Sequence, residues 1–286
     1  MRLTIRDLQK MKTEGEKLVM LTAYDATSAR IAEAAGVPLL LIGDTLGMVV
    51  QGHDSTIPVT LDHMIYHCSI VARVTKKPFL VGDLPFMTYA VSPEQAMQNA
   101  ARLMQESGVS AVKLEGGSFM APTIRRITQA GIPVMAHIGL TPQSVNQFGG
   151  FRVQGRDLAD ARALIADAEA VQAAGAFAVV LELVPISLAE IITKRLHIPT
   201  IGIGAGAGCD GQVQVFHDIL ALFDQFVPRH AKQYAQVGDL MKQAIEQYVD
   251  EVEAGTFPDK DHAFTMGDDV VAILREEYME EQDGSR

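Results

Sequence analysis

Three short apolar runs in this sequence each end in an acidic residue: residues 39–44 (LLLIGD), 79–83 (FLVGD) and 111–115 (AVKLE). An apolar run that stops at a carboxylate is typical of a buried parallel strand whose last residue reaches solvent. The carboxyl ends of parallel strands lie together, so Asp44, Asp83 and Glu115 are expected to meet at one edge of a sheet. Like charges converge only where something positive lies among them. A divalent cation is the simplest candidate, and the pattern therefore predicts an active site.

The predicted ligand set favours a hard metal ion. Two Asp and one Glu offer only oxygen donors, which suit Mg²⁺ or Mn²⁺ better than Zn²⁺. A 2-keto acid could chelate such an ion through its carboxylate and keto oxygens, and polarisation of the ketone would acidify the adjacent C–H bond. The residues alone therefore indicate a metal-assisted enolate reaction that makes or breaks a C–C bond on a keto acid.

Other polar residues stand at predicted strand ends. Lys113 and Glu115 share one face of their strand, and they form either a structural ion pair or part of the site. His137 follows another strand, and a structural hydrogen-bonding role is as good an interpretation as a functional one. Glu182 ends the run 178–181 at a distance from the three acids, which suits a general base.

Two further patterns have mainly structural interpretations. Asp25 precedes an expected helix and is predicted to be its N-cap. Residues 202–207 (GIGAGA) match a loose dinucleotide-binding pattern but continue into 209–211 (CDG) rather than into a helix. A backbone loop that approaches a substrate closely is the better functional interpretation.

A repeated junction predicts the fold. Helix-like segments end in Gly and enter the next apolar run, often through Pro, which is the signature of a C-cap followed by a strand. This rhythm predicts eight strands alternating with helices, hence an α/β protein with a (β/α)8 TIM barrel, and a doubly wound open sheet is the alternative. The expected strands are residues 19–24, 39–43, 79–82, 111–114, 133–136, 178–181, 200–203 and 213–216.

The helical pattern extends beyond the last strand. Residues 157–174 place five side chains on one helical face: Leu158, Ala161, Ile165, Ala168 and Val171. After Phe226 the pattern is purely helical, over 236–254 and 268–281. We therefore expect one barrel domain over 1–286, with residues from about 232 as a C-terminal helical appendage that packs outside the barrel or on a neighbouring subunit. Residues 280–286 are predicted to be disordered.

Composition argues against several kinds of binding partner and cellular location. A net charge of −11 argues against nucleic acid or anionic membranes as partners. Two cysteines provide no disulfide framework and indicate a reducing compartment. The first ten residues contain no apolar signal core, and no apolar stretch approaches the roughly 18 residues of a membrane span. These features predict a cytoplasmic protein.

The chain resembles the ketopantoate hydroxymethyltransferase family over nearly its whole length. The resemblance rests on six segments in order: 21–25 (LTAYD), 43–47 (GDTLG), 82–86 (GDLPF), 112–117 (VKLEGG), 137–143 (HIGLTPQ) and 202–206 (GIGAG). It implies a TIM barrel and transfer of a hydroxymethyl group from 5,10-methylenetetrahydrofolate to 3-methyl-2-oxobutanoate. The product would be 2-dehydropantoate, in pantothenate and coenzyme A biosynthesis. Family members are typically homodecamers.

The resemblance also assigns roles. It implies a Mg²⁺ site at Asp44, Asp83 and Glu115, and keto-acid contacts at Asp44, Thr45, Asp83 and Lys113. It makes Glu182 the proton acceptor and puts His137 near the substrate. Thr45 departs from the Ser common in the family, but it keeps the hydroxyl and the main-chain N–H. Residues 147–152 are suggested as a mobile cover.

Two other hypotheses remain open from the sequence. One is a related barrel lyase of the isocitrate-lyase or phosphoenolpyruvate-mutase kind, which usually carries a catalytic Cys on a lid loop that neither Cys68 nor Cys209 fits well. The other is a non-catalytic barrel that binds a small acid or builds an assembly. Product analysis with and without folate separates the first from the transferase, and calorimetry of keto-acid binding with and without Mg²⁺ tests the second.

Overall fold

The structure is a computed structural model that describes residues 1–150, 152–223 and 226–279. Phe151, in the suggested cover, and the predicted disordered residues 280–286 lie outside this range. The chain divides into two compact units, Met1–Ala235 and Gln236–Arg286. No helix of the described part has both the length and the apolar composition to cross a membrane.

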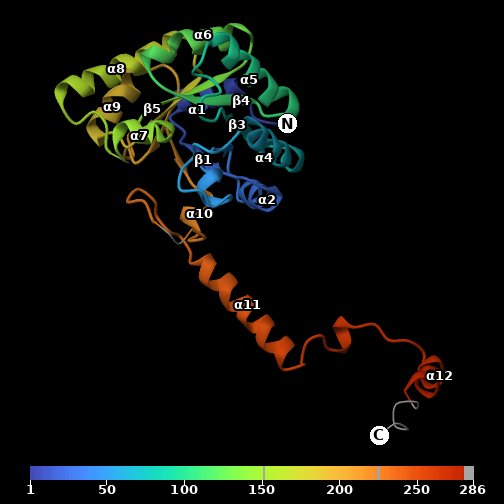
Figure 1. The fold of residues 1–286 in the computed structure, drawn as a ribbon. Helices are drawn as coiled ribbons and strands as arrows, with labels where there is room; N and C mark the ends of the chain where they lie inside the picture. Colours follow the sequence, from blue (N-terminus) through green and yellow to red (C-terminus); the bar gives the residue numbers. More distant parts are fainter. Residues whose placement is uncertain (151, 224–225, 280–286) are drawn as a thin grey trace. The chain divides into compact units, whose positions relative to one another are not determined.

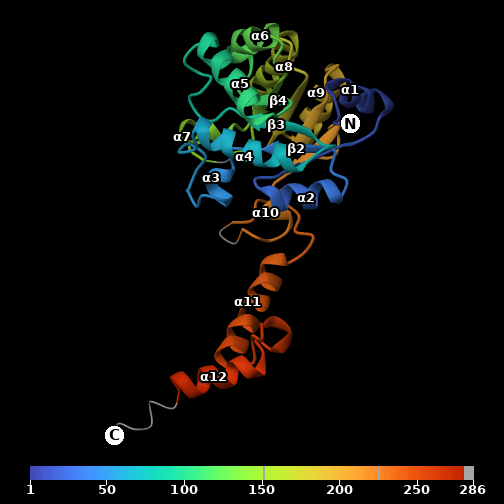
Figure 2. The ribbon, with the colours of Figure 1, turned by 90° about the vertical axis from the view of Figure 1, so that its right-hand side faces the viewer.

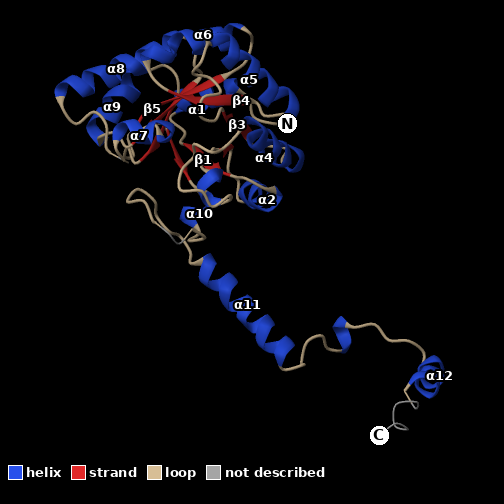
Figure 3. Cartoon of the chain, in the orientation of Figure 1, coloured by secondary structure: helices blue, strands red, loops and turns tan. Residues whose placement is uncertain are grey.

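The first unit contains a closed barrel of eight parallel strands in sequence order (Figures 1 and 3). The strands are β1 (Leu18–Thr22), β2 (Leu39–Ile42), β3 (Phe79–Asp83), β4 (Ala111–Glu115), β5 (Val134–Gly139), β6 (Ala178–Glu182), β7 (Thr200–Ile203) and β8 (Gly211–Gln214). β8 pairs with β1 and closes the sheet. All eight predicted strands are present, and the TIM barrel rather than the open sheet is confirmed.

Helices surround this sheet (Figure 2). They are α1 (Ile5–Glu14), α2 (Ala26–Ala34), α3 (Leu46–Val49), α4 (Leu61–Val74), α5 (Pro93–Ser107), α6 (Ala121–Gln129), α7 (Val145–Phe148), α8 (Leu158–Ala173), α9 (Ile186–Arg195) and α10 (Phe216–Ile219). Short 3₁₀ helices η1 (Ser118–Met120) and η2 (Pro142–Ser144) follow β4 and β5. Asp25 caps α2 as predicted, because its carboxylate accepts a hydrogen bond from Ser28 N at 2.7 Å.

Successive side chains along each strand point to opposite faces of the sheet, so the apolar side chains form two clusters. Leu80 and Leu114 belong to the cluster between sheet and helices, whereas Val81 and Ala111 belong to the cluster inside the barrel. Leu8 of α1 is buried in the inner cluster. Helix α1 therefore contributes to the packing of the barrel interior.

One predicted helical face is partly wrong. Leu158 is 66% exposed, and the buried residues of α8 are Leu164, Ala168 and Val171. Leu158 directly follows the N-cap Asp157, so it lies in the first turn. The buried stripe is set by contacts further along the helix.

The connection from β7 to β8, residues 204–210, contains no helix. A Cβ on Gly206 would lie 2.8 Å from Ile186 Cγ1, and one on Gly208 would lie 2.2 Å from Glu190 Cγ. Both of these side chains belong to α9. The glycines that suggested a loop close to substrate thus have a packing reason, because only Gly allows the backbone to approach this helix.

The second unit contains α11 (Val237–Glu253), η3 (Lys260–His262) and α12 (Asp268–Tyr278). The predicted helices are present. Neither α11 nor α12 has a buried residue in the described part, and their apolar side chains, including Leu240, Ile245 and Ile273, are exposed.

Candidate active site

All seven residues predicted for the site line one cavity at the carboxyl ends of the strands. They are Asp44, Thr45, Asp83, Lys113, Glu115, His137 and Glu182. The sheet register accounts for this, because Asp83 lies beside Lys113, Glu115 beside His137, and Gly139 beside Glu182. Strand pairing alone therefore gathers groups from β3 to β6.

Lys113 pairs with Asp83 and not with Glu115. Its Nζ lies 2.9 Å from Asp83 Oδ1, and the two side chains are only 5% and 3% exposed. The other oxygen, Asp83 Oδ2, accepts a hydrogen bond from Asp44 N at 3.1 Å. The suggested structural pair between Lys113 and Glu115 is therefore replaced by a cross-strand pair to β3.

Acidic side chains outnumber basic ones in this cavity. Asp44, Asp83 and Glu115 are each at most 4% exposed, and Lys113 is the ammonium among them. Burial and the neighbouring Asp83 raise the pKa of Asp44 to about 7. Burial also raises the pKa of Glu115 well above its usual range. The pKa of Lys113 is raised as well: burial opposes this shift, but Asp83, Glu115 and Asp44 outweigh it.

The positions of these acids show whether they could bind the predicted metal ion. The described part of the chain has no group of three or more Asp, Glu, His or Cys side chains arranged as a ready-made metal site. One reason is that protein donors already hold these oxygens: Lys113 and Asp44 N hold the two oxygens of Asp83, and Gln143 holds Asp44 Oδ2 and Glu115 Oε2. Asp44 and Glu115 each keep a second oxygen, and three buried acids share a single ammonium, so a bound cation would supply the positive charge that their ionised forms need. The donor set therefore fits a hard divalent cation.

His137 connects the acids to Glu182. The ammonium of Lys113 lies 3.4 Å from Nδ1, and Glu182 Oε2 lies 3.2 Å from Nε2. A cationic donor at Nδ1 makes this nitrogen the acceptor, so we assign the proton to Nε2, where it faces Glu182. Burial and Lys113 both lower the pKa of His137, which favours the neutral ring. His137 therefore lies beside the carboxylate of Glu182 without adding positive charge, and its Nε2 makes no hydrogen bond within the described part of the chain.

Comparison with known proteins identifies the family. The family model described as ketopantoate hydroxymethyltransferase matches residues 2–260. A 3-methyl-2-oxobutanoate hydroxymethyltransferase of Chloroflexus aurantiacus is 62% identical over 266 residues, 93% of this chain and 94% of that protein. The chain belongs to the ketopantoate hydroxymethyltransferase family. It is therefore an enzyme, a hydroxymethyltransferase.

A further family relative and two solved structures extend the comparison. A 3-methyl-2-oxobutanoate hydroxymethyltransferase of Dehalococcoides mccartyi is 52% identical over 282 residues, 99% of this chain and 100% of that protein. A phosphonopyruvate hydrolase matches with a TM-score of 0.60 at 14% identity, covering 98% of each chain. A phosphoenolpyruvate phosphomutase from Streptomyces platensis subsp. rosaceus matches with a TM-score of 0.58 at 17% identity, covering 98% of this chain and 97% of its own. At these identities the two structures support the fold alone.

Sequence reasoning missed two residues of this family member's site. Gln143 and Tyr89 are both buried and both contact groups of the predicted set. Gln143 follows the end of β5, and a long uncharged polar residue at a strand end is a usable signal. Tyr89 lies in the irregular segment between β3 and α5, where no periodic pattern indicates which residues point inward.

Proposed function

We propose that this chain transfers a hydroxymethyl group from 5,10-methylenetetrahydrofolate to 3-methyl-2-oxobutanoate in a Mg²⁺-dependent reaction. The product is 2-dehydropantoate, in pantothenate and coenzyme A biosynthesis. The observation that carries the proposal is one cavity containing three buried acids, Lys113 and the His137–Glu182 pair. The names of the relatives support the acceptor.

Each residue has a task in this reaction. Asp44, Asp83 and Glu115 would hold Mg²⁺, which when bound withdraws electrons from the keto group of the acceptor. Thr45 offers its hydroxyl and main-chain N–H to the substrate, together with Asp44, Asp83 and Lys113. Glu182 removes the proton from C3 of the keto acid, and the neutral imidazole of His137 lies 3.2 Å from this carboxylate.

Charge and atoms balance in the proposed transfer. Loss of the C3 proton moves an electron pair toward the keto oxygen, where the ammonium of Lys113 stabilises the negative charge. C3 then forms a bond to the one-carbon unit, the bonds from that carbon to the folate nitrogens break, and water supplies the hydroxyl group. Tetrahydrofolate leaves as the second product.

Hydrogen exchange tests the first half of this reaction. The wild-type enzyme with Mg²⁺ in D₂O should exchange the C3 hydrogen of 3-methyl-2-oxobutanoate without folate, as seen by loss of its proton NMR signal. Addition of 5,10-methylenetetrahydrofolate should then yield 2-dehydropantoate. Absence of exchange with both Mg²⁺ and Mn²⁺ would contradict the proposal, and keto-acid cleavage without folate would favour the lyase.

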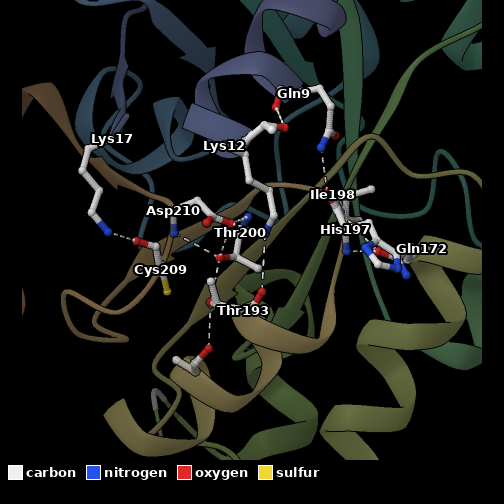
Figure 4. Close-up of polar contacts among 12 residues, drawn as sticks. Gln9, Lys12, Lys17, Gln172, Thr193, His197, Ile198, Thr200, Cys209 and Asp210 are labelled. Atoms are coloured by element: carbon white, nitrogen blue, oxygen red, sulfur yellow. Dashed lines mark hydrogen bonds and ion pairs between the residues drawn. The ribbon is translucent and has the colours of Figure 1, made fainter. Parts of the chain in front are cut away.

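The positions of the cysteines support the transferase over the lyase. Cys68 is buried within α4. Cys209 is also buried; its carbonyl accepts a hydrogen bond from Lys17 Nζ, and the next residue, Asp210, accepts hydrogen bonds from Thr200 (Figure 4). Neither thiol lines the cavity that contains Glu182.

The same proposal includes a cytoplasmic homodecamer. Support for assembly comes from the exposed apolar side chains of α11 and α12, such as Leu240, Ile245 and Ile273, which another subunit could cover. The free thiols of Cys68 and Cys209 agree with a reducing compartment. Light scattering of the full chain should give ten times the chain mass, and a monomer would contradict this part.

A further inference from the structure

Gln143 occupies a central position among the strand-end acids. It lies in η2 directly after β5, and its side chain is buried, with 4% of the residue exposed. Its Nε2 donates hydrogen bonds to Asp44 Oδ2 at 2.7 Å and to Leu84 O at 3.1 Å. Its main-chain N donates to Glu115 Oε2 at 3.1 Å. One residue therefore holds two of the three carboxylates.

Tyr89 fixes the orientation of the Gln143 amide. The Tyr89 hydroxyl donates to Gln143 Oε1 at 2.6 Å and lies 3.4 Å from the donating N of Glu115. In the flipped amide, the carbonyl oxygen would face two acceptors, Asp44 Oδ2 and Leu84 O. That arrangement is repulsive, so the hydrogen-bond partners allow one orientation.

Gln143 holds Asp44 and Glu115 with uncharged donors, and this distinguishes it from a basic residue. A Lys or Arg at the same place would hold the acids and also neutralise them, as Lys113 does for Asp83. Amide and main-chain N–H groups hold Asp44 and Glu115 without adding a positive charge, so the charge that balances these acids can come from a cation. Neighbouring groups of this kind commonly change metal affinity by about 10- to 100-fold when they are removed.

We propose that Gln143, held by Tyr89, is a positioning residue that presents Asp44 and Glu115 to the divalent cation. This inference rests on the proposed Mg²⁺ site and deepens it. It concerns residues that act through the ligands, without contact to the cation.

The test measures metal affinity in the absence of substrate. Gln143→Met keeps the length of the side chain and the main-chain N–H but removes the amide, and Tyr89→Phe removes only the hydroxyl. Isothermal titration with Mg²⁺, and electron paramagnetic resonance with Mn²⁺, should give 10- to 100-fold weaker binding for Gln143→Met. Tyr89→Phe should weaken binding less, because the amide can still reach Asp44.

A matched control separates positioning from general stability. Gln172 accepts hydrogen bonds from His197 N at 2.6 Å and Ile198 N at 3.2 Å, and it does not line the cavity. Gln172→Met should lower the melting temperature and leave the Mg²⁺ affinity unchanged. Circular dichroism of all variants in chelator shows which of them fold.

The outcomes distinguish this inference from the proposed function. If the wild-type chain binds neither Mg²⁺ nor Mn²⁺, the metal site and the inference both fail. If the wild type binds metal and exchanges the C3 hydrogen, but folded Gln143→Met binds as tightly, only the inference is overturned. If Gln143→Met does not fold, Tyr89→Phe decides, and unchanged affinity in that variant overturns the inference.

Discussion

The two edges of this barrel accommodate buried charge in different ways. At the amino-terminal edge, where β7 and β8 begin, Lys12 Nζ lies 2.7 Å from Asp210 Oδ2 (Figure 4). The same oxygen accepts hydrogen bonds from Thr200 N at 2.8 Å and Thr200 Oγ1 at 3.0 Å. One acid here meets one base and further donors, so the charge is balanced.

At the carboxyl-terminal edge, where the strands end, the balance is missing. Lys113 pairs with Asp83, while Asp44 and Glu115 are buried beside them with uncharged donors. A complete ion pair stabilises a fold only modestly, but incomplete pairing in a cavity marks a place where a ligand supplies the remaining charge. The difference between the edges separates a structural network from a candidate catalytic one.

Removal of the proposed base should have the largest effect. Glu182→Gln keeps the size of the side chain and an oxygen beside His137, but it cannot accept the C3 proton. Exchange of the C3 hydrogen should fall about 10²- to 10⁴-fold, with little change in keto-acid affinity measured by calorimetry. Glu190→Gln on the exposed surface of α9 is the control and should keep full exchange. Normal exchange in Glu182→Gln would assign the base to another group.

Removal of the ammonium tests the charge balance of the carboxyl-terminal edge. Lys113→Met leaves Asp83 Oδ1 buried without its cation, which commonly costs about 3–5 kcal/mol of unfolding free energy when one partner of a buried pair is removed. Urea unfolding at pH 8 in chelator measures this loss, and turnover should also disappear. A Lys113→Met variant as stable as the wild type would mean that the acids are not balanced by this residue.

Much of this site could be predicted because it depends on local patterns. Asp44, Asp83, Glu115 and Glu182 each end an apolar run, and strand order alone brings such ends to one edge. The partner of Lys113 could not be predicted, because its pairing with Asp83 depends on the register between β3 and β4. The contacts of Gln143 with Asp44 and Leu84 could not be predicted either, because they join segments about 60 to 100 residues apart in the chain.

The fold shows the same division. Seven strands were predictable from their apolar runs, whereas β8 (Gly211–Gln214) contains one apolar residue, Val213, and begins two residues before its predicted position. The absence of a helix in the connection 204–210 was predicted from its sequence, but the packing of its glycines against side chains of α9 was not. The buried face of α8 was also only partly predictable. Helical periodicity indicates a stripe, and tertiary packing decides that Leu164 is covered and Leu158 exposed.

Within the described part of the chain, Asp218 is buried neither in an ion pair, like Asp210, nor beside a proposed cation site, like Asp44. It follows β8 in α10, is 7% exposed, and burial raises its pKa to about 6. The folded state therefore binds a proton more tightly than the unfolded state, and wild-type stability falls as the pH rises from about 4 to about 6. Asp218→Asn removes the group whose titration causes this loss of stability. The difference in unfolding free energy between Asp218→Asn and the wild type should therefore shift in favour of the variant by about 1–3 kcal/mol as the pH rises from 4 to 7.

Chemical denaturation at both pH values measures this change, and Asp7 provides a control of opposite sign. Hydrogen bonds from Thr4 lower the pKa of Asp7. Its contribution to stability is present above the ordinary Asp pKa and is lost as the pH falls below it. Asp7→Asn should therefore lose stability relative to wild type as the pH rises. Parallel behaviour of the two variants would contradict the assigned directions.

The smallest effect is expected at the amino-terminal edge. Lys12→Met removes the cation beside Asp210, but Thr200 keeps two hydrogen bonds to the carboxylate, and the Lys12 and Asp210 side chains are 13% and 16% exposed. The loss of unfolding free energy should be about 1–2 kcal/mol, between the values for exposed and fully buried pairs. Turnover and Mg²⁺ affinity should stay at the wild-type level in steady-state and calorimetric measurements. The same Lys-to-Met change would then cost stability alone at one edge and both stability and activity at the other, whereas lost turnover in folded Lys12→Met would show that the amino-terminal edge also serves the reaction.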